Sequence, residues 1–172
     1  MFVPIGDDNP LKRIRFQYVT IALIAVNVLA FLLETVTGSE PAVVASFAVI
    51  PQELFQVSFF DGAAPFSADA IPIPERATLF SYMFLHGDFM HLAGNMLFLW
   101  VFGDNVEDAM GHLRFFVFFL VCGIIAGLAH AFMMPDSQDA LIGASGAVSG
   151  VIAAYLMLHP RVNVWVLVFR YI

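Results

Sequence analysis

Residues 140–160, ALIGASGAVSGVIAAYLMLHP, decide the fold of this chain. The segment carries no charged residue, and its length is close to the ~20 residues that a helix needs to cross the hydrocarbon of a membrane. It opens with small residues around one serine, Ser145. Gly146, Gly150 and Ala154 recur every four positions, a spacing that lets a second helix approach closely. We therefore predict a tightly packed membrane helix with a serine near its start.

The composition of the whole chain agrees with a membrane protein. Of its 172 residues, 60% are hydrophobic and only 12% are charged, whereas a soluble domain has roughly 25% charged residues. The net charge of −7 disfavours a nucleic-acid partner. A single cysteine, Cys122, rules out an intrachain disulfide and a cysteine-rich metal site. The sequence predicts one all-α integral membrane domain over residues 1–172, with no cofactor and no bound nucleic acid.

Three further apolar runs extend the prediction to four transmembrane helices. Residues 16–33 and 115–135 have lengths that suit a span. Residues 89–103 form a shorter run, so this helix either continues past its charged residues or sits low in the bilayer. After Arg161, residues 162–169 (VNVWVLVF) fit a loop, a strand or the start of another span.

The placement of basic residues predicts the orientation. Lysine and arginine collect in cytoplasmic loops, and three of them lie just before the first span, so residues 1–15 are predicted to be a cytoplasmic tail. Alternation then places residues 34–88 outside, as a long outer loop that lies partly in the membrane. Within it, PQELFQVSFFDG (51–62) carries Phe55, Phe59 and Phe60. This segment fits an interfacial helix or a partly ordered loop with aromatic anchors.

Polar residues gather at one depth near the outer face. His91 and Asn95 open the second span four residues apart, which places them on one helix face. Ser145 opens the fourth span on the same side, and His86 lies just before the second. A serine at a helix N-terminus lies beside unpaired N–H groups that suit an oxyanion. Polar groups in a span are functional candidates.

Each of these residues also has a structural interpretation. Ser145 fits an N-cap that satisfies a free backbone N–H. His91 fits a buried histidine bonded to a carbonyl, and Asn95 fits a helix–helix hydrogen bond. A zinc site is not expected, because His86 and His91 are five residues apart, whereas the zinc motif H-E-x-x-H spaces its histidines by four.

HGDFMHLAGNMLFLWVFGDNVEDAMG (86–111) and GASGAVSG (143–150) together resemble the rhomboid intramembrane serine proteases, most closely the bacterial type. The resemblance implies an endopeptidase of the bacterial inner membrane that cleaves the transmembrane segments of other proteins near the outer face of the bilayer. It implies that Ser145 is the nucleophile and that His91 and Asn95 stabilise the oxyanion. The implied supporting residues are Gly143, Gly146 and His86, with Glu107 and Gly111 as a structural motif.

The resemblance also implies six core helices with a base histidine on the sixth. Four spans are expected here, and His159 lies about 21 Å along the helix from Ser145 at 1.5 Å per residue, too far to be the base. We therefore expect the base beyond residue 172, and the 172 residues alone to be inactive. The sequence is then a fragment or a naturally short relative. The alternative function is a non-proteolytic protein that binds other membrane proteins; a channel is disfavoured because the polar residues cluster at one side.

Overall fold

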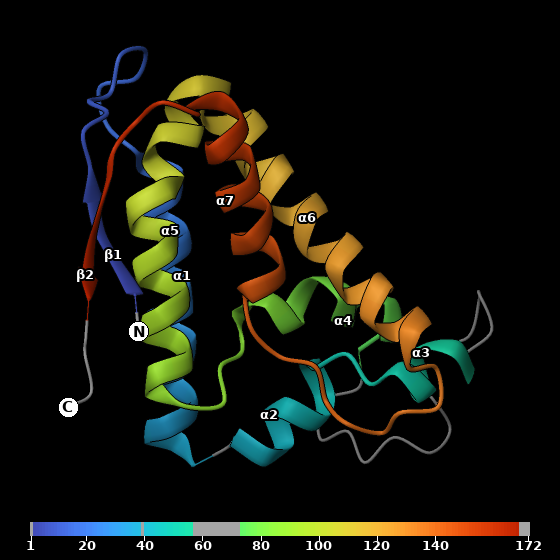
Figure 1. The fold of residues 1–172 in the computed structure, drawn as a ribbon. Coiled ribbons are helices and arrows are strands. Elements are labelled where there is room, and N and C mark those ends of the chain that lie inside the picture. Colours follow the sequence, from blue (N-terminus) through green and yellow to red (C-terminus); the bar gives the residue numbers. More distant parts are fainter. Residues whose placement is uncertain (1, 39, 57–72, 169–172) are drawn as a thin grey trace.

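The computed structural model describes residues 2–38, 40–56 and 73–168, and its body is a bundle of long helices. These are α1 (Tyr18–Thr37), α5 (Phe89–Met110), α6 (His112–Met133) and α7 (Ser145–Leu158). Between α1 and α5 lie the short helices α2 (Glu40–Phe47), α3 (Pro51–Gln56), α4 (Glu75–Ser81) and the 3₁₀ turn η1 (Tyr82–Phe84). Figure 1 shows α7 between α5 and α6, with α2 and α3 gathered at one end of the bundle.

Among the described residues, two helices are long and apolar enough to cross a membrane. They are α1 and α6, with mean hydropathies of 2.3 and 2.4. The expected span at 140–160 is shorter than predicted, since α7 has 14 residues and begins only at Ser145. Residues 140–144 are instead a loop, because Leu141 pairs with the backbone of Val49 and Gly143 adopts a φ of +111° that a helix cannot contain.

Helix α5 continues past its charged residues, as one of the two alternatives predicted. The carboxylate of Glu107, fully buried, accepts hydrogen bonds from the backbone N–H groups of Val19 (3.0 Å) and Thr20 (2.8 Å). Asp108 accepts the N–H groups of Arg13 and Ile14 at 2.6 and 2.7 Å. These side chains satisfy donors at and before the first turn of α1, where a negative charge is also favoured by the helix dipole.

The chain is not entirely helical, because part of the predicted tail, residues 1–15, forms a β-strand. Strand β1 (Phe2–Asp7) pairs antiparallel with β2 (Val164–Val168), so the described part of the segment predicted as a loop, a strand or a span is a strand. The VWVLV sequence of β2 is rich in β-branched residues, which favour strands. A two-stranded ribbon is marginal alone, and β1 is fixed to the bundle where Asp7 accepts a hydrogen bond from Asn105 (3.1 Å).

The predicted outer loop, residues 34–88, is largely helical where it is described. Helix α1 continues to Thr37, and Pro51–Gln56 forms α3, in agreement with a helical segment at 51–62. Phe55 packs against Phe132 of α6, with ring centroids 5.2 Å apart. Phe59 and Phe60 lie outside the described residues.

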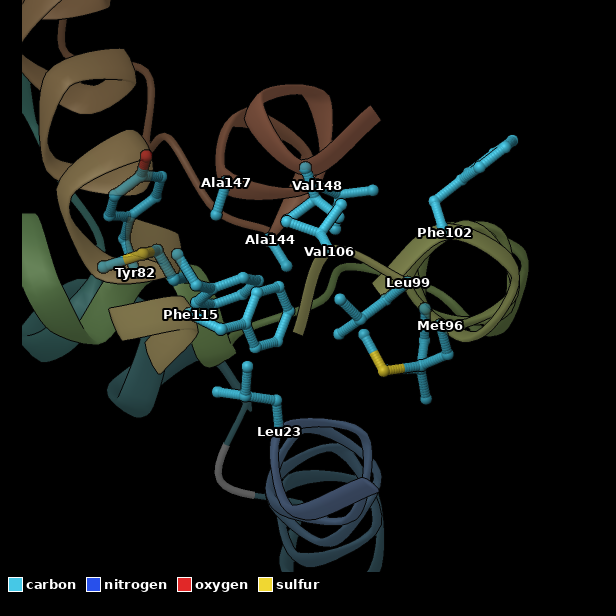
Figure 2. Packing of buried hydrophobic residues seen from close by; sticks show 14 of the residues in the cluster. Leu23, Tyr82, Met96, Leu99, Phe102, Val106, Phe115, Ala144, Ala147 and Val148 are labelled. Atoms are coloured by element: carbon cyan, nitrogen blue, oxygen red, sulfur yellow. The ribbon is translucent and has the colours of Figure 1, made fainter. Parts of the chain in front are cut away.

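Side chains from all four long helices form one core. Figure 2 shows Leu23 of α1, Leu99 of α5, Phe115 of α6 and Val148 of α7 directed toward a common centre. Helices α6 and α7 approach very closely, because a Cβ on Gly146 would lie only 2.4 Å from the Cβ of Ala126. The small-residue stripe therefore packs against a neighbouring helix, as expected.

Candidate active site

The first turn of α5 positions two of the candidate residues. Asp88 is the N-cap of this helix, and its carboxylate accepts the backbone N–H of His91 at 2.8 Å. Asn95 lies one turn further along and donates from Nδ2 to the carbonyl of His91 at 3.2 Å. The amide therefore bonds within its own helix, and the predicted helix–helix bond is not what the structure shows.

The loop that leads to Ser145 is held by the outer loop at several points. The backbones of Val49 and Leu141 exchange two hydrogen bonds, of 2.8 and 3.2 Å. Closer to the serine, the N–H of Gly143 donates to the carbonyl of Tyr82 at 2.9 Å. Tyr82 is itself anchored, because its hydroxyl donates to the carbonyl of Gly123 on α6 at 2.7 Å. These hydrogen bonds fix the course of the backbone just before Ser145.

Ser145 is the first residue of α7, and its side chain is exposed. The N-cap is Ala144, and within the described residues the Ser145 hydroxyl makes no capping hydrogen bond. The N-cap interpretation of Ser145 is therefore wrong. Its hydroxyl is available for chemistry at the end of a helix where the first backbone N–H groups have no partner inside the helix.

Ser145, His91 and Asn95 line one cavity of about 310 Å³ between α5 and α7. The apolar side chains in its lining are those of Met90, Phe98, Val148 and Ile152. Three of the four polar residues predicted to lie at one depth are thus brought together, and His86 is not part of the lining. Two of these residues contribute nitrogen atoms and the third a free hydroxyl, the groups needed to attack a carbonyl and to hold the resulting oxyanion.

Gly143 lets the ring of His91 lie against the backbone before the serine. A Cβ at this position would lie 2.6 Å from Cε1 and 2.7 Å from Nε2 of His91. The Nε2 edge of the ring therefore faces the loop two residues before Ser145. Within the described chain, the His91 ring has no hydrogen-bond partner, so the interpretation of His91 as a histidine bonded to a carbonyl is wrong.

His86 lies behind His91 rather than in the cavity lining. It is 2% exposed, and its ring meets that of His91 edge to face, with centroids 5.1 Å apart. Burial lowers the pKa of His86 to about 4, and the neighbouring His91 lowers it in the same direction. The His86 ring is therefore neutral at physiological pH.

The remaining predicted residues have structural positions. Gly146 packs against Ala126 rather than lining the cavity. Gly111 has a φ of +83° at the junction of α5 and α6, a conformation that favours glycine. His159 follows the far end of α7 and packs against Tyr155, away from Ser145. The described residues contain no group of three or more histidine, cysteine or acidic side chains that could hold a metal ion.

Three residues near the site were not predicted. Asp88 carries a usable signal, because an aspartate directly before an apolar run is a typical N-cap. Ser149 lines the same cavity, and its i+4 spacing from Ser145 could have revealed it. Tyr82 has no such signal, since its backbone carbonyl meets the N–H of Gly143 only in the folded structure.

Comparisons with known proteins agree on one family. Residues 74–172, more than half of the chain, match the Rhomboid domain. RHOMBOID-like protein 5 of Arabidopsis thaliana is 32% identical over 91 residues, which are 53% of this chain and 29% of that protein. Rhomboid protein 1, mitochondrial, of Saccharomyces cerevisiae is 29% identical over 56% of this chain and 29% of its own length. The rhomboid protease GluP of Bacillus subtilis is 39% identical over 42% of this chain and 14% of its own length.

The aligned part of the chain thus spans less than a third of each of these relatives. No solved structure matches the chain. The family match covers both α5, with His91 and Asn95, and α7, with Ser145. It includes the described segments that line the cavity and the loop before Ser145. This chain belongs to the rhomboid family of membrane proteins.

Proposed function

We propose that the chain carries the nucleophile and oxyanion site of an intramembrane serine endopeptidase that cleaves transmembrane segments of other proteins. The observation that carries this proposal is the shared cavity. Ser145 lines it together with His91 and Asn95, and the Ser145 hydroxyl is not used to cap the helix. A merely structural serine at this position would cap α7. The protease name of the Bacillus subtilis relative supports the same class of function.

In the proposed reaction, Oγ of Ser145 attacks the substrate carbonyl and its proton passes to a general base. His91, Asn95 and the backbone N–H of Ser145 hold the oxyanion. The base returns the proton to the leaving amine, and water then hydrolyses the acyl-enzyme. We assign the base to a histidine on a further helix beyond residue 172, because a serine needs an adjacent base to be a strong nucleophile.

We further propose that the site opens toward the outer face of a membrane, the inner membrane in a bacterial cell. Lys12, Arg13 and Arg15 are exposed near the start of α1, at the end of the bundle opposite Ser145. The end rich in basic residues is the cytoplasmic end of a membrane protein. Substrates then present a peptide bond near the outer end of their transmembrane helix.

The test uses the full-length protein in liposomes with a fluorophosphonate probe and a transmembrane reporter substrate. We expect covalent labelling that maps by mass spectrometry to Ser145 and not to Ser149, which lies one turn deeper in the same cavity. Ser145→Ala should abolish labelling and cleavage. Labelling or cleavage that persists in Ser145→Ala refutes the proposal, and a client protein that co-purifies uncut with the unlabelled wild type supports the alternative binding function.

A further inference from the structure

The inference concerns His86, a buried ring next to the site whose nitrogen atoms have no role in the proposed reaction. Within the described part of the chain, neither Nδ1 nor Nε2 of His86 makes a hydrogen bond of normal geometry, although the backbone of Phe84 lies close enough to raise the pKa of the ring. A buried polar group without a partner costs free energy, and native proteins keep few of them. A phenyl ring would fill the same space without that cost, so the nitrogen atoms of His86 call for an explanation.

The geometry relates His86 to only one element of the site, the ring of His91. The two rings meet edge to face at 5.1 Å. The Cε1–Nε2 edge of His91 lies against Gly143. His91 therefore contacts both His86 and the loop before Ser145, with Nε2 toward that loop.

The chemistry of an oxyanion donor sets a requirement on His91. A neutral histidine carries one proton, on Nδ1 or on Nε2, and which of them carries it is set by the hydrogen bond that the other nitrogen makes. For Nε2 to donate to an oxyanion beside Ser145, a neutral His91 must keep its proton there. Its Nδ1 is then an acceptor, and no described residue donates to it.

We propose that His86 is a positioning residue that fixes the tautomer of His91. The neutral His86 ring supplies one N–H, which donates to Nδ1 of His91 through a single water molecule. This bond keeps the His91 proton on Nε2, directed toward the developing oxyanion. The inference rests on the proposed function, because it assigns His86 a role only through His91.

The variant that tests this role is His86→Phe, which keeps an aromatic ring and removes both nitrogen atoms. We expect kcat for the transmembrane reporter to fall by about 10-fold with KM unchanged, as for other groups that orient a reacting histidine. The midpoint of thermal unfolding at neutral pH should not fall, because no packing is lost. His86→Gln, which retains a donor, should recover part of kcat. His130→Phe makes the same substitution at a histidine of α6 and should leave kcat unchanged.

A second measurement does not depend on activity. The ¹⁵N chemical shifts of the His91 ring in micelles report its tautomer, and we expect one form with the proton on Nε2 in the wild type and a mixture in His86→Phe. An unchanged tautomer together with unchanged kcat in His86→Phe overturns the inference. Failure of the proposed function has a different signature, namely cleavage that persists in Ser145→Ala, and the ¹⁵N result can be interpreted in either case.

Discussion

The ring of His91 occupies the space that a side chain at residue 143 would need. Gly143 combines a φ of +111° with a would-be Cβ position only 2.6 Å from Cε1 of His91. The ring of His91 on α5 therefore packs directly against the backbone of the loop before α7. This contact helps to set the position of the proposed oxyanion donor relative to Ser145.

Gly143→Ala should therefore abolish cleavage while the protein still folds. The new methyl group must displace His91 or the loop, and a shift of about 1 Å in a reacting group can cost about 100-fold in rate. The control is Gly38→Ala, which has a positive φ of +64° but no atom within 4 Å of its Cβ position. It carries backbone strain without the clash. Equal losses of activity in the two variants would show that strain alone is responsible.

The close contact between α6 and α7 predicts that one substitution lowers stability and that a second, on the facing helix, restores it. Gly146→Ala places a methyl group 2.4 Å from the Cβ of Ala126, and overpacking of this kind costs about 1–3 kcal/mol. Ala126→Gly removes the opposing methyl group, so the double variant should regain most of the lost stability. The stabilities of the four proteins form a double-mutant cycle. If the two effects simply add, the contact is not the cause of the loss.

The sequence predicted which polar residues lie together better than it predicted the boundaries of the fold. Ser145, His91 and Asn95 were placed together because an alternating membrane topology fixes the depth of each helix end. The start of α7 was misplaced, since the interactions that keep residues 140–144 out of the helix come from Val49 and Tyr82, far away in sequence. A strand was one of the alternatives for residues 162–169, but β1 and its pairing with β2 were missed for the same reason, because the pairing joins the two ends of the described chain.

Glu107 offers a test of how α1 is fixed to α5. Its carboxylate accepts four hydrogen bonds, from the N–H groups of Val19 and Thr20, the hydroxyl of Thr20 and Nδ1 of His112. Glu107→Gln replaces one acceptor oxygen with a donor that faces other donors. We expect a loss of about 2–4 kcal/mol, because bonds to a charged group are worth about 1.5–3 kcal/mol each and a mismatch adds to the cost.

The measurement for Glu107→Gln is reversible unfolding in mixed micelles. Asp136→Asn is the matched control, since Asp136 is an exposed carboxylate in the loop after α6 and removing its charge breaks no described bond. A stability equal to that of the wild type in Glu107→Gln would mean that the hydrogen bonds to α1 contribute little.

The buried His86 makes stability depend on pH with a definite sign. Its pKa in the folded state is about 4, below the usual histidine pKa of 6.5, so the unfolded chain binds more protons between these two values. The stability that comes from keeping His86 neutral is complete above pH 6.5 and is lost as the pH falls toward 4. The charged or titratable neighbours that act on this ring are His91 and Asp88.

Between pH 7.5 and pH 5, the wild type should therefore lose on the order of 2 kcal/mol more than His86→Phe, which has no proton to bind. The comparison of the two proteins removes the contribution of other carboxyl and imidazole groups, because these are shared. Chemical unfolding at the two pH values measures the difference. Equal losses in both proteins would mean that the His86 ring is protonated as easily in the folded chain as in the unfolded one, and is therefore not shielded from water behind His91.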